Sequence, residues 1–204
     1  MSDVYATARP GLRARLGSAL AARARARRHA QFRALTGVGG GMRILDVGCG
    51  RLGLRALEPG LDITGVDLVE RPGYPGPFVR ADATRELPFE DGAFDLVYSS
   101  SVVEHLAPAD RPGFASEVLR VGRAWWVQTP AFSFPIEPHA LLPFAHWLPP
   151  RVRRPYWRLG VAGEWEDIAL LRRGDLARLF PGGDVVAERV GPVAKSWIAV
   201  GSRA

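Results

Sequence analysis

The stretch that decides the fold is RILDVGCGRLG, from Arg43 to Gly53. Its first half is an apolar run of the kind that forms a central strand of a parallel sheet covered on both faces. In its second half Gly48, Gly50 and Gly53 have the spacing G-x-G-x-x-G of dinucleotide-binding folds. Asp46 stands two residues before the first glycine, where a carboxylate is unfavourable beside a pyrophosphate. The stretch therefore favours a cofactor without phosphate groups.

The composition describes one globular domain. The chain has 204 residues, 47% of them hydrophobic and 24% charged, and contains no apolar run long enough for a membrane span. Its N-terminus lacks the apolar core of a secretory signal, so a cytoplasmic location is expected. The single cysteine, Cys49, excludes a disulfide within the chain, and the four histidines show no metal-ligand spacing, so no metal site is predicted.

Basic charge is concentrated at the N-terminus. Residues 1–33 contain eight arginines and one aspartate, a net charge of +7, whereas the whole chain has +6. From Gly11 to Leu35 the sequence is rich in Ala, Leu and Arg and has no proline, which predicts a helical arm that could break near Gly17. The arginines of residues 1–33 could make a weak contact with an anionic surface. No specific nucleic-acid partner is expected, because the rest of the chain has no basic stripe.

Strand and helix patterns alternate after the arm. Five strand-like segments fall within residues 42–130 and two within residues 184–202. Helical patterns cover Arg111–Val121 and residues 172–180, and only a short helix fits before Pro59. This alternation predicts an α/β fold with a doubly wound sheet.

Residues 131–171 interrupt the alternation. They contain six prolines and three tryptophans and far exceed the usual connection of about 2–6 residues. Because long insertions at the carboxyl ends of strands usually cover a site, we expect a lid here. The predicted single domain, 1–204, is thus divided into a basic helical arm (1–38), a cofactor-binding core (39–130), a lid or substrate insertion (131–171) and a C-terminal helix with two strands (172–204).

Three segments carry a family resemblance: ILDVGCG at 44–50, ITGVDL at 63–68, and RADATRELPFEDGAFDLVYSSSVVEHL at 80–106. In this order they resemble the class I S-adenosyl-L-methionine-dependent methyltransferases, in particular a bacterial subgroup of the methyltransferase type 11 group. The resemblance implies a Rossmann-like seven-stranded sheet, mostly parallel with an antiparallel last strand. It also implies S-adenosyl-L-methionine as cofactor and S-adenosyl-L-homocysteine as product. This cofactor is cationic and carries no phosphate, which suits Asp46.

The resemblance implies cofactor contacts at the ends of the first four strands. Asp67 would accept hydrogen bonds from both ribose hydroxyls, and Asp82 would accept one from the adenine amino group. Gly53 lies one place later than the usual third glycine of the family. The other implied cofactor-binding residues form the glycine turn, the adenine pocket and the methionyl end: Asp46, Gly48, Cys49, Gly50, Leu68, Ala83, Ser99 and Ser100.

The methyl acceptor is predicted to be a small molecule, such as a secondary metabolite, glycan or lipid-linked compound, with transfer to oxygen favoured. An acceptor that must lose a proton near neutral pH needs a base, which makes His105 and His139 the candidate catalytic residues. Glu137, two residues before His139 in an extended segment, would point to the same side and orient the imidazole. Alternatively, Glu137 caps a helix and His139 hydrogen-bonds the loop. Trp147 is a further candidate for acceptor contact.

Two other function classes remain open at this level. The first is an RNA or protein methyltransferase guided by the arginine arm, although the chain has no N-P-P-Y-like tetrad for a base amine. The second is a non-catalytic module that retains the cofactor fold for binding. The presence of Asp46, Asp67 and Asp82 argues against this second class.

Overall fold

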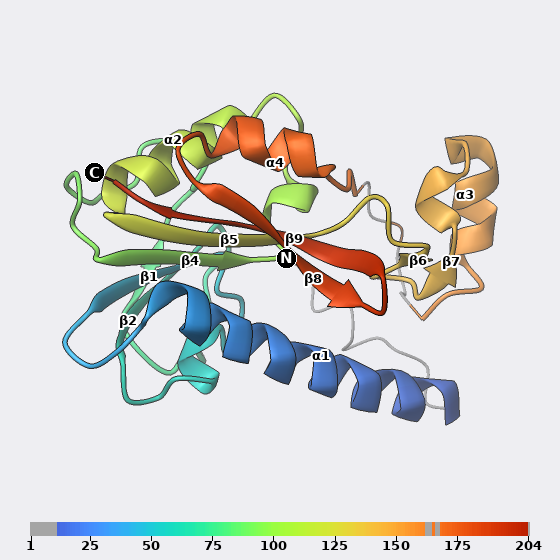
Figure 1. Ribbon diagram of the computed structural model, residues 1–204, viewed down its shortest axis with the longest axis horizontal. Coiled ribbons are helices and arrows are strands. Elements are labelled where there is room, and N and C mark those ends of the chain that lie inside the picture. The colour runs from blue at the N-terminus through green and yellow to red at the C-terminus, as the bar shows by residue number, and fades with distance from the viewer. Residues whose placement is uncertain (1–11, 162–164, 166–167, 204) are drawn as a thin grey trace.

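The centre of the molecule is a seven-stranded sheet with the order β3-β2-β1-β4-β5-β9-β8 (Figure 1). The structure is a computed structural model that describes residues 12–161, 165 and 168–203. Strand β9 is antiparallel to its neighbours β5 and β8, whereas the pairs among β1 to β5 are parallel. This arrangement confirms the predicted sheet. The strands are β1 Arg43–Val47, β2 Asp62–Asp67, β3 Phe78–Arg80, β4 Leu96–Ser100, β5 Ala124–Pro130, β8 Asp184–Val190 and β9 Val193–Ser202.

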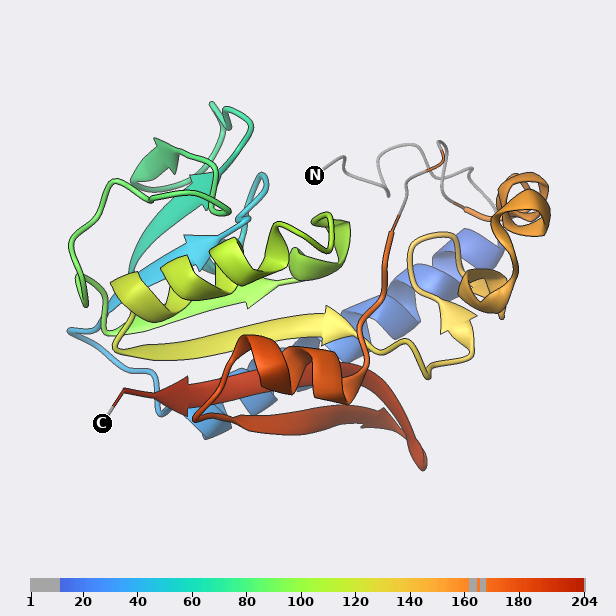
Figure 2. The same cartoon turned by 90° about the horizontal axis from the view of Figure 1, so that it is seen from above.

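Helices cover both faces of this sheet. Figures 1 and 2 show α2 (Arg111–Val121) and α4 (Arg173–Leu179) on one face and α1 (Leu12–Thr36) on the other. Because side chains alternate along a strand, β1 supplies both cores. Leu45 packs in the cluster beneath α2 and α4, and Ile44 packs in the cluster beneath α1.

Helix α1 runs without a break through Gly17, so the expected interruption there is wrong. One glycine costs a helix only about 1 kcal/mol relative to alanine, and the neighbouring Ala and Arg residues are strong helix formers. Near the end of the helix, Phe32 is 1% exposed. Its ring packs edge to face on Tyr98 at 5.0 Å and on Trp126 at 5.5 Å. These contacts attach α1 to the sheet.

The insertion after β5 lies beyond the carboxyl ends of β4 and β5 (Figure 2). It has an apolar cluster of its own, which includes Ala140, Leu142 and Trp157. Among the described residues, no helix is both long and apolar enough to cross a bilayer. The elements of the insertion are β6 Ile136–Glu137, β7 Leu142–Pro143, η3 Ala145–Trp147 and α3 Pro150–Trp157.

Candidate functional site

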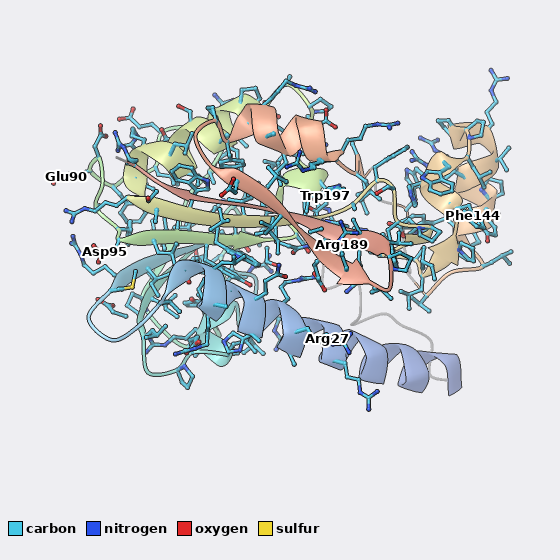
Figure 3. The ribbon with its side chains drawn as sticks, viewed as in Figure 1. Arg27, Glu90, Asp95, Phe144, Arg189 and Trp197 are labelled. Atoms are coloured by element: carbon cyan, nitrogen blue, oxygen red, sulfur yellow. The ribbon has the colours of Figure 1, made fainter. Side chains whose placement is uncertain are left out.

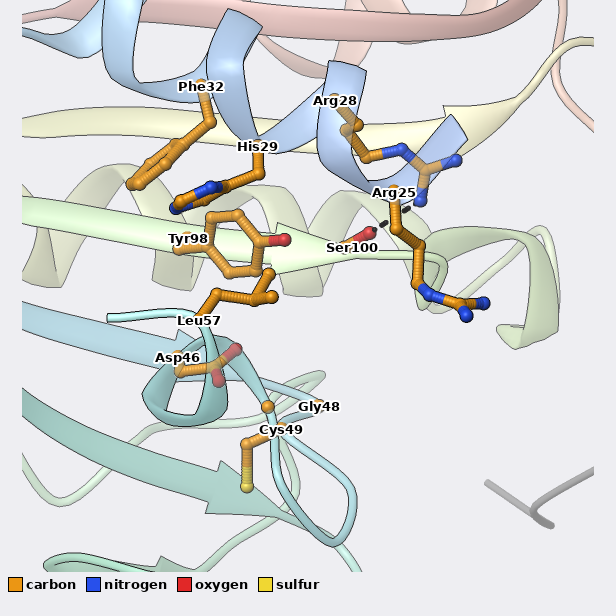
Figure 4. A pocket seen from close by; sticks show the side chains of 11 residues that line it. Arg25, Arg28, His29, Phe32, Asp46, Gly48, Cys49, Leu57, Tyr98 and Ser100 are labelled. Carbon is orange, nitrogen blue, oxygen red and sulfur yellow. Dashed lines mark hydrogen bonds between the residues drawn. The ribbon is translucent and has the colours of Figure 1, made fainter. Parts of the chain in front are cut away.

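A cavity of about 200 Å³ lies at the carboxyl ends of β1 and β4, on the face covered by α1 (Figure 4). Strand alternation directs Asp46, Tyr98 and Ser100 towards this face. Residues from α1, β1, the glycine turn and β4 therefore meet around one space. The lining residues are Arg25, Arg28, His29, Phe32, Asp46, Gly48, Cys49, Gly53, Leu57, Tyr98 and Ser100.

The backbone N–H groups of the glycine turn are used within the protein. Those of Gly48 and Cys49 donate to the carbonyl of Val66 at 2.8 and 3.2 Å, and that of Gly50 donates to Oδ2 of Asp67 at 3.0 Å. A pyrophosphate site needs such N–H groups directed at the ligand, followed by a helix N-terminus. Here a single turn of 3-10 helix, η1 (Leu54–Ala56), follows the turn, as the sequence predicts. The turn therefore offers no cradle for a dinucleotide.

Asp46 is a buried carboxylate, 2% exposed, at the end of β1. Its Oδ2 accepts the N–H of Leu54 at 2.6 Å, so the first residue of η1 is held directly above the strand. Burial raises the pKa of Asp46 to about 7, the Leu54 N–H opposes this rise, and the charge of Asp67 adds to it. A carboxyl group with such a pKa is poised to gain full charge when a cation binds beside it.

Gly53 completes the turn for a steric reason. It has φ 54° and ψ −154°, and a Cβ on it would lie 2.1 Å from Oδ2 of Asp46. This glycine, one place later than the family pattern expects, makes room for the buried carboxylate. Cys49 is also buried, and burial together with the charges of Asp46 and Asp67 raises the pKa of its thiol to about 12. The thiol is thus neutral, and its Sγ lies 3.6 Å from the carbonyl oxygen of Gly50.

Asp67, the predicted ribose ligand, is surrounded by donors. Oδ2 accepts the N–H of Gly50 at 3.0 Å and Nε of Arg71 at 3.1 Å. Oδ1 accepts the N–H of Val69 at 3.0 Å and Nη2 of Arg71 at 3.3 Å. A carboxylate has about four acceptor positions, so a ribose could bind Asp67 only after the Arg71 guanidinium moves away.

The predicted adenine-binding residues follow Asp67 along the edge of the sheet. Leu68 is 61% exposed and thus presents an apolar surface. Oδ1 of Asp82 accepts the N–H and the hydroxyl of Thr84 at 3.0 and 2.7 Å, and these two bonds lower its pKa. Ala83 is half-buried and packs against the core beneath α2. Asp82 therefore shapes a turn, with Oδ2 3.7 Å from Arg85.

The two predicted serines of β4 lie on opposite faces. Ser99 is fully buried, and its hydroxyl donates to the carbonyl of Val47 at 3.0 Å. Ser100 lines the cavity, where its hydroxyl donates to Oε1 of Gln128 at 2.7 Å. The alternation of a strand allows only one of two successive side chains to reach the site.

Arginines of α1 form the cavity wall that the sequence did not indicate. Arg28 lies between Oε2 of Glu188, 3.0 Å from its Nε, and the hydroxyl of Ser100, 3.2 Å from its Nη1. Arg25, one turn earlier, is exposed and reaches towards the same space (Figure 4). By contrast, Arg27 points away from the sheet (Figure 3). Part of the basic arm is thus directed inward.

The two candidate catalytic histidines lie together beyond the ends of β4 and β5. His105 ends η2 (Val103–His105), and its ring packs edge to face on that of His139 with 5.0 Å between centroids. Oε1 of Glu137 lies 2.8 Å from Nδ1 of His139, and its Oε2 accepts the N–H groups of His139 and Ala140. Glu137 therefore holds a turn after β6, where the alternative expected a helix cap, and it also orients the imidazole.

Trp147, the last predicted substrate residue, lies at the end of η3. It is 45% exposed, and its indole N–H donates to the carbonyl of Phe132 at 2.8 Å. Its ring lies 5.2 Å from that of Phe144, which is 51% exposed. The insertion thus carries an exposed pair of aromatic side chains.

Comparison with known proteins identifies the core. Residues 45–124 match the family described as "Methyltransferase domain". This segment thus resembles a methyltransferase domain, and the chain has the fold of the class I methyltransferases. An "Uncharacterized methyltransferase" of Mycobacterium sp. (strain KMS) is 39% identical over 93 residues, which are 41% of this chain and 36% of that protein. The chain therefore spans only about a third of the length of this curated relative.

Two solved structures share the fold of this chain. The PH0226 protein of Pyrococcus horikoshii has a TM-score of 0.60 at 18% identity, with 84% of this chain and 86% of that chain covered. The 1,6-didemethyltoxoflavin-N1-methyltransferase of Burkholderia thailandensis has a TM-score of 0.52 at 18% identity, with 91% and 85% covered. The latter was solved with 1,6-didemethyltoxoflavin and S-adenosylhomocysteine bound.

The segment that matches the family contains one side of the candidate site. Asp46, the glycine turn, Asp67 and His105 fall within residues 45–124. Arg25, Arg28 and His139 fall outside it. The arm and the insertion therefore supply groups that lie outside the matched segment.

Proposed function

We propose that the protein is an S-adenosyl-L-methionine-dependent methyltransferase that acts on the oxygen of a small molecule. The observation that carries this proposal is the charge pattern of the cavity. Asp46 lies on one side of it, and the guanidinium groups of Arg25 and Arg28 lie on the other. A methionyl group carries an ammonium and a carboxylate, so a site with one acidic and one basic wall is complementary to it.

The remaining predicted contacts continue from this cavity. The methionyl end would occupy the space between Asp46 and Arg28, and the ribose would displace Arg71 from Asp67. Leu68, exposed beside Asp67, would support one face of the adenine. The bound cofactor supplies a methyl group on a cationic sulfur, and the low-dielectric surroundings of Asp46 strengthen the attraction of its carboxylate for that charge.

For the acceptor, His139 is the proposed base and Glu137 its positioning residue. The carboxylate of Glu137 lies 2.8 Å from Nδ1 of His139, which keeps the imidazole in one orientation. Removal of a hydroxyl proton by Nε2 during methyl transfer is the chemistry that this pair suits. The insertion that carries both residues would enclose the acceptor.

Calorimetric titration with S-adenosyl-L-homocysteine tests the proposal. We expect binding that Asp67→Asn weakens at least tenfold, equivalent to about 1.4 kcal/mol. Asp62→Asn is the matched control, since Asp62 is an exposed aspartate at the other end of the same strand. No binding by the wild-type protein, or equal weakening by both variants, would reject the proposal. Binding without turnover across a panel of hydroxyl-bearing acceptors would favour the non-catalytic module.

A further inference from the structure

Three groups that can bind a metal ion meet beyond the carboxyl ends of β4 and β5. They are the carboxylate of Glu104 and the imidazoles of His105 and His139, and one ligand atom of each lies within 4.8 Å of the other two. Glu104 and His105 are neighbours in η2, whereas His139 belongs to the insertion. The cluster therefore joins the methyltransferase core to the insertion.

The surroundings of Glu104 favour a bound cation. It is fully buried, and its Oε2 accepts the hydroxyl of Thr129 at 3.0 Å. Within the part of the chain that the structure describes, its Oε1 is buried without a hydrogen-bond partner. A buried carboxylate oxygen is costly unless a donor or a metal ion compensates for the lost water.

His139 is held in the manner of a metal ligand. Oε1 of Glu137 lies 2.8 Å from its Nδ1, and Glu137 is itself buried and fixed by the backbone N–H groups of His139 and Ala140. A carboxylate behind an imidazole is the usual support of a metal-bound histidine, because it fixes the tautomer and increases the basicity of the other nitrogen. The lone pair then resides on Nε2.

The chemistry of the set favours one class of ion. Two imidazoles and one carboxylate suit borderline divalent ions such as Zn²⁺, whereas Mg²⁺ and Ca²⁺ prefer oxygen ligands alone. With bonds of about 2.1 Å, ligand atoms around a tetrahedral ion lie about 3.4 Å apart, so the present separations need displacements of under about 1 Å per atom. Such displacements need only small side-chain rotations.

We propose that Glu104, His105 and His139 bind a divalent transition-metal ion of the zinc type, with a remaining coordination position open to an oxygen or nitrogen atom of the methyl acceptor. Three protein ligands leave a tetrahedral ion one free position, and both histidines are only partly buried, so this position is accessible. Its assignment to the acceptor rests on the proposed function with one change: an Nε2 of His139 that binds the ion cannot act as base, so the bound ion would lower the pKa of the acceptor hydroxyl in its place.

Zinc binding by the full chain, without an affinity tag and stripped of metal, tests this proposal. We expect one Zn²⁺ per chain in competition with a chromophoric chelator, at an affinity that Glu104→Gln and His139→Ala each reduce at least tenfold. Glu137→Gln should reduce it about 10- to 100-fold, as the loss of a supporting carboxylate does elsewhere. The matched control is His29→Gln, which removes a histidine outside the cluster and should leave the zinc affinity unchanged.

A second readout is independent of activity and of stability. The protein loaded with Co²⁺ should show the visible absorption of a low-symmetry site, and His139→Ala should change its intensity and shape. Wild-type zinc affinity in both Glu104→Gln and His139→Ala, with circular dichroism showing that both are folded, would overturn the proposal. So would the absence of stoichiometric zinc from the wild-type protein.

Titration of the same preparations with S-adenosyl-L-homocysteine separates this inference from the proposed function. A protein that binds S-adenosyl-L-homocysteine but does not bind zinc overturns the metal site alone. A protein that binds zinc but does not bind S-adenosyl-L-homocysteine supports the metal site and rejects the methyltransferase proposal. It also rejects the assignment of the open coordination position to a methyl acceptor.

Discussion

Replacement of Gly53 by alanine tests the physical role of the late third glycine. The backbone at Gly53, with φ 54° and ψ −154°, lies in a region that only glycine adopts without strain. A Cβ would also lie 2.1 Å from Oδ2 of Asp46 and would displace the carboxylate that accepts the N–H of Leu54. The backbone strain costs about 1–3 kcal/mol, and the loss of a buried charged hydrogen bond costs about 1.5–3 kcal/mol. We therefore expect the free energy of unfolding to fall by about 2.5–6 kcal/mol.

The control for this experiment is Gly191→Ala, in the turn between β8 and β9. Gly191 has φ 57°, and a Cβ on it would meet nothing within 4 Å. This variant retains the left-handed strain of about 1–2 kcal/mol without the clash. Denaturant titration followed by the fluorescence of the six tryptophans measures both free energies. Equal losses in the two variants would refute the argument that Gly53 makes room for Asp46.

Three further predictions concern charged groups of the cavity and its surroundings. Folding raises the pKa of Asp46 from 3.8 to about 7, so the folded protein binds this proton more tightly and the free energy of unfolding should fall as the pH rises from about 4 to about 7. Denaturant titrations at several pH values measure this dependence, and Asp46→Asn should make it weaker. Arg28→Ala removes one of the two cations beside the buried Glu188, leaves Lys195 as the other, and should lower the melting temperature by several degrees, whereas the exposed Arg27→Ala should not change it. Arg71→Met should tighten binding of S-adenosyl-L-homocysteine, measured by calorimetry, because the ligand no longer has to displace a guanidinium from Asp67; weaker binding would mean that the arginine itself holds the ligand.

The sheet and helix α2 could be predicted from the sequence because their information is local. The apolar runs before Asp46 and Asp67 are typical of buried parallel strands, and the Arg111–Val121 helix has the predicted bounds. The expected break at Gly17 is wrong because the strong helix formers around this glycine outweigh its low helix propensity. Local patterns thus predicted the elements better than their interruptions.

The parts of the site that could not be predicted depend on distant contacts. The sequence places Arg28 in a basic helical arm, but nothing local indicates its partner Glu188, which is 160 positions away. The spacing of the histidines indicated no metal ligands, because 34 positions separate His105 from His139 and only the insertion brings them together. A charge pattern gives the sign of the net charge of a segment, but it does not show which side chains of that segment face the protein interior.

The buried thiol of Cys49 is a natural chemical probe for opening of the glycine turn. It is the single cysteine, 5% exposed, with a pKa raised to about 12. A thiol reagent attacks the thiolate, so labelling must wait until the turn opens and the side chain reaches water. The rate of labelling in native buffer thus measures how often this one segment opens, without any engineered probe. A ligand seated on the turn would slow that rate in proportion to its occupancy.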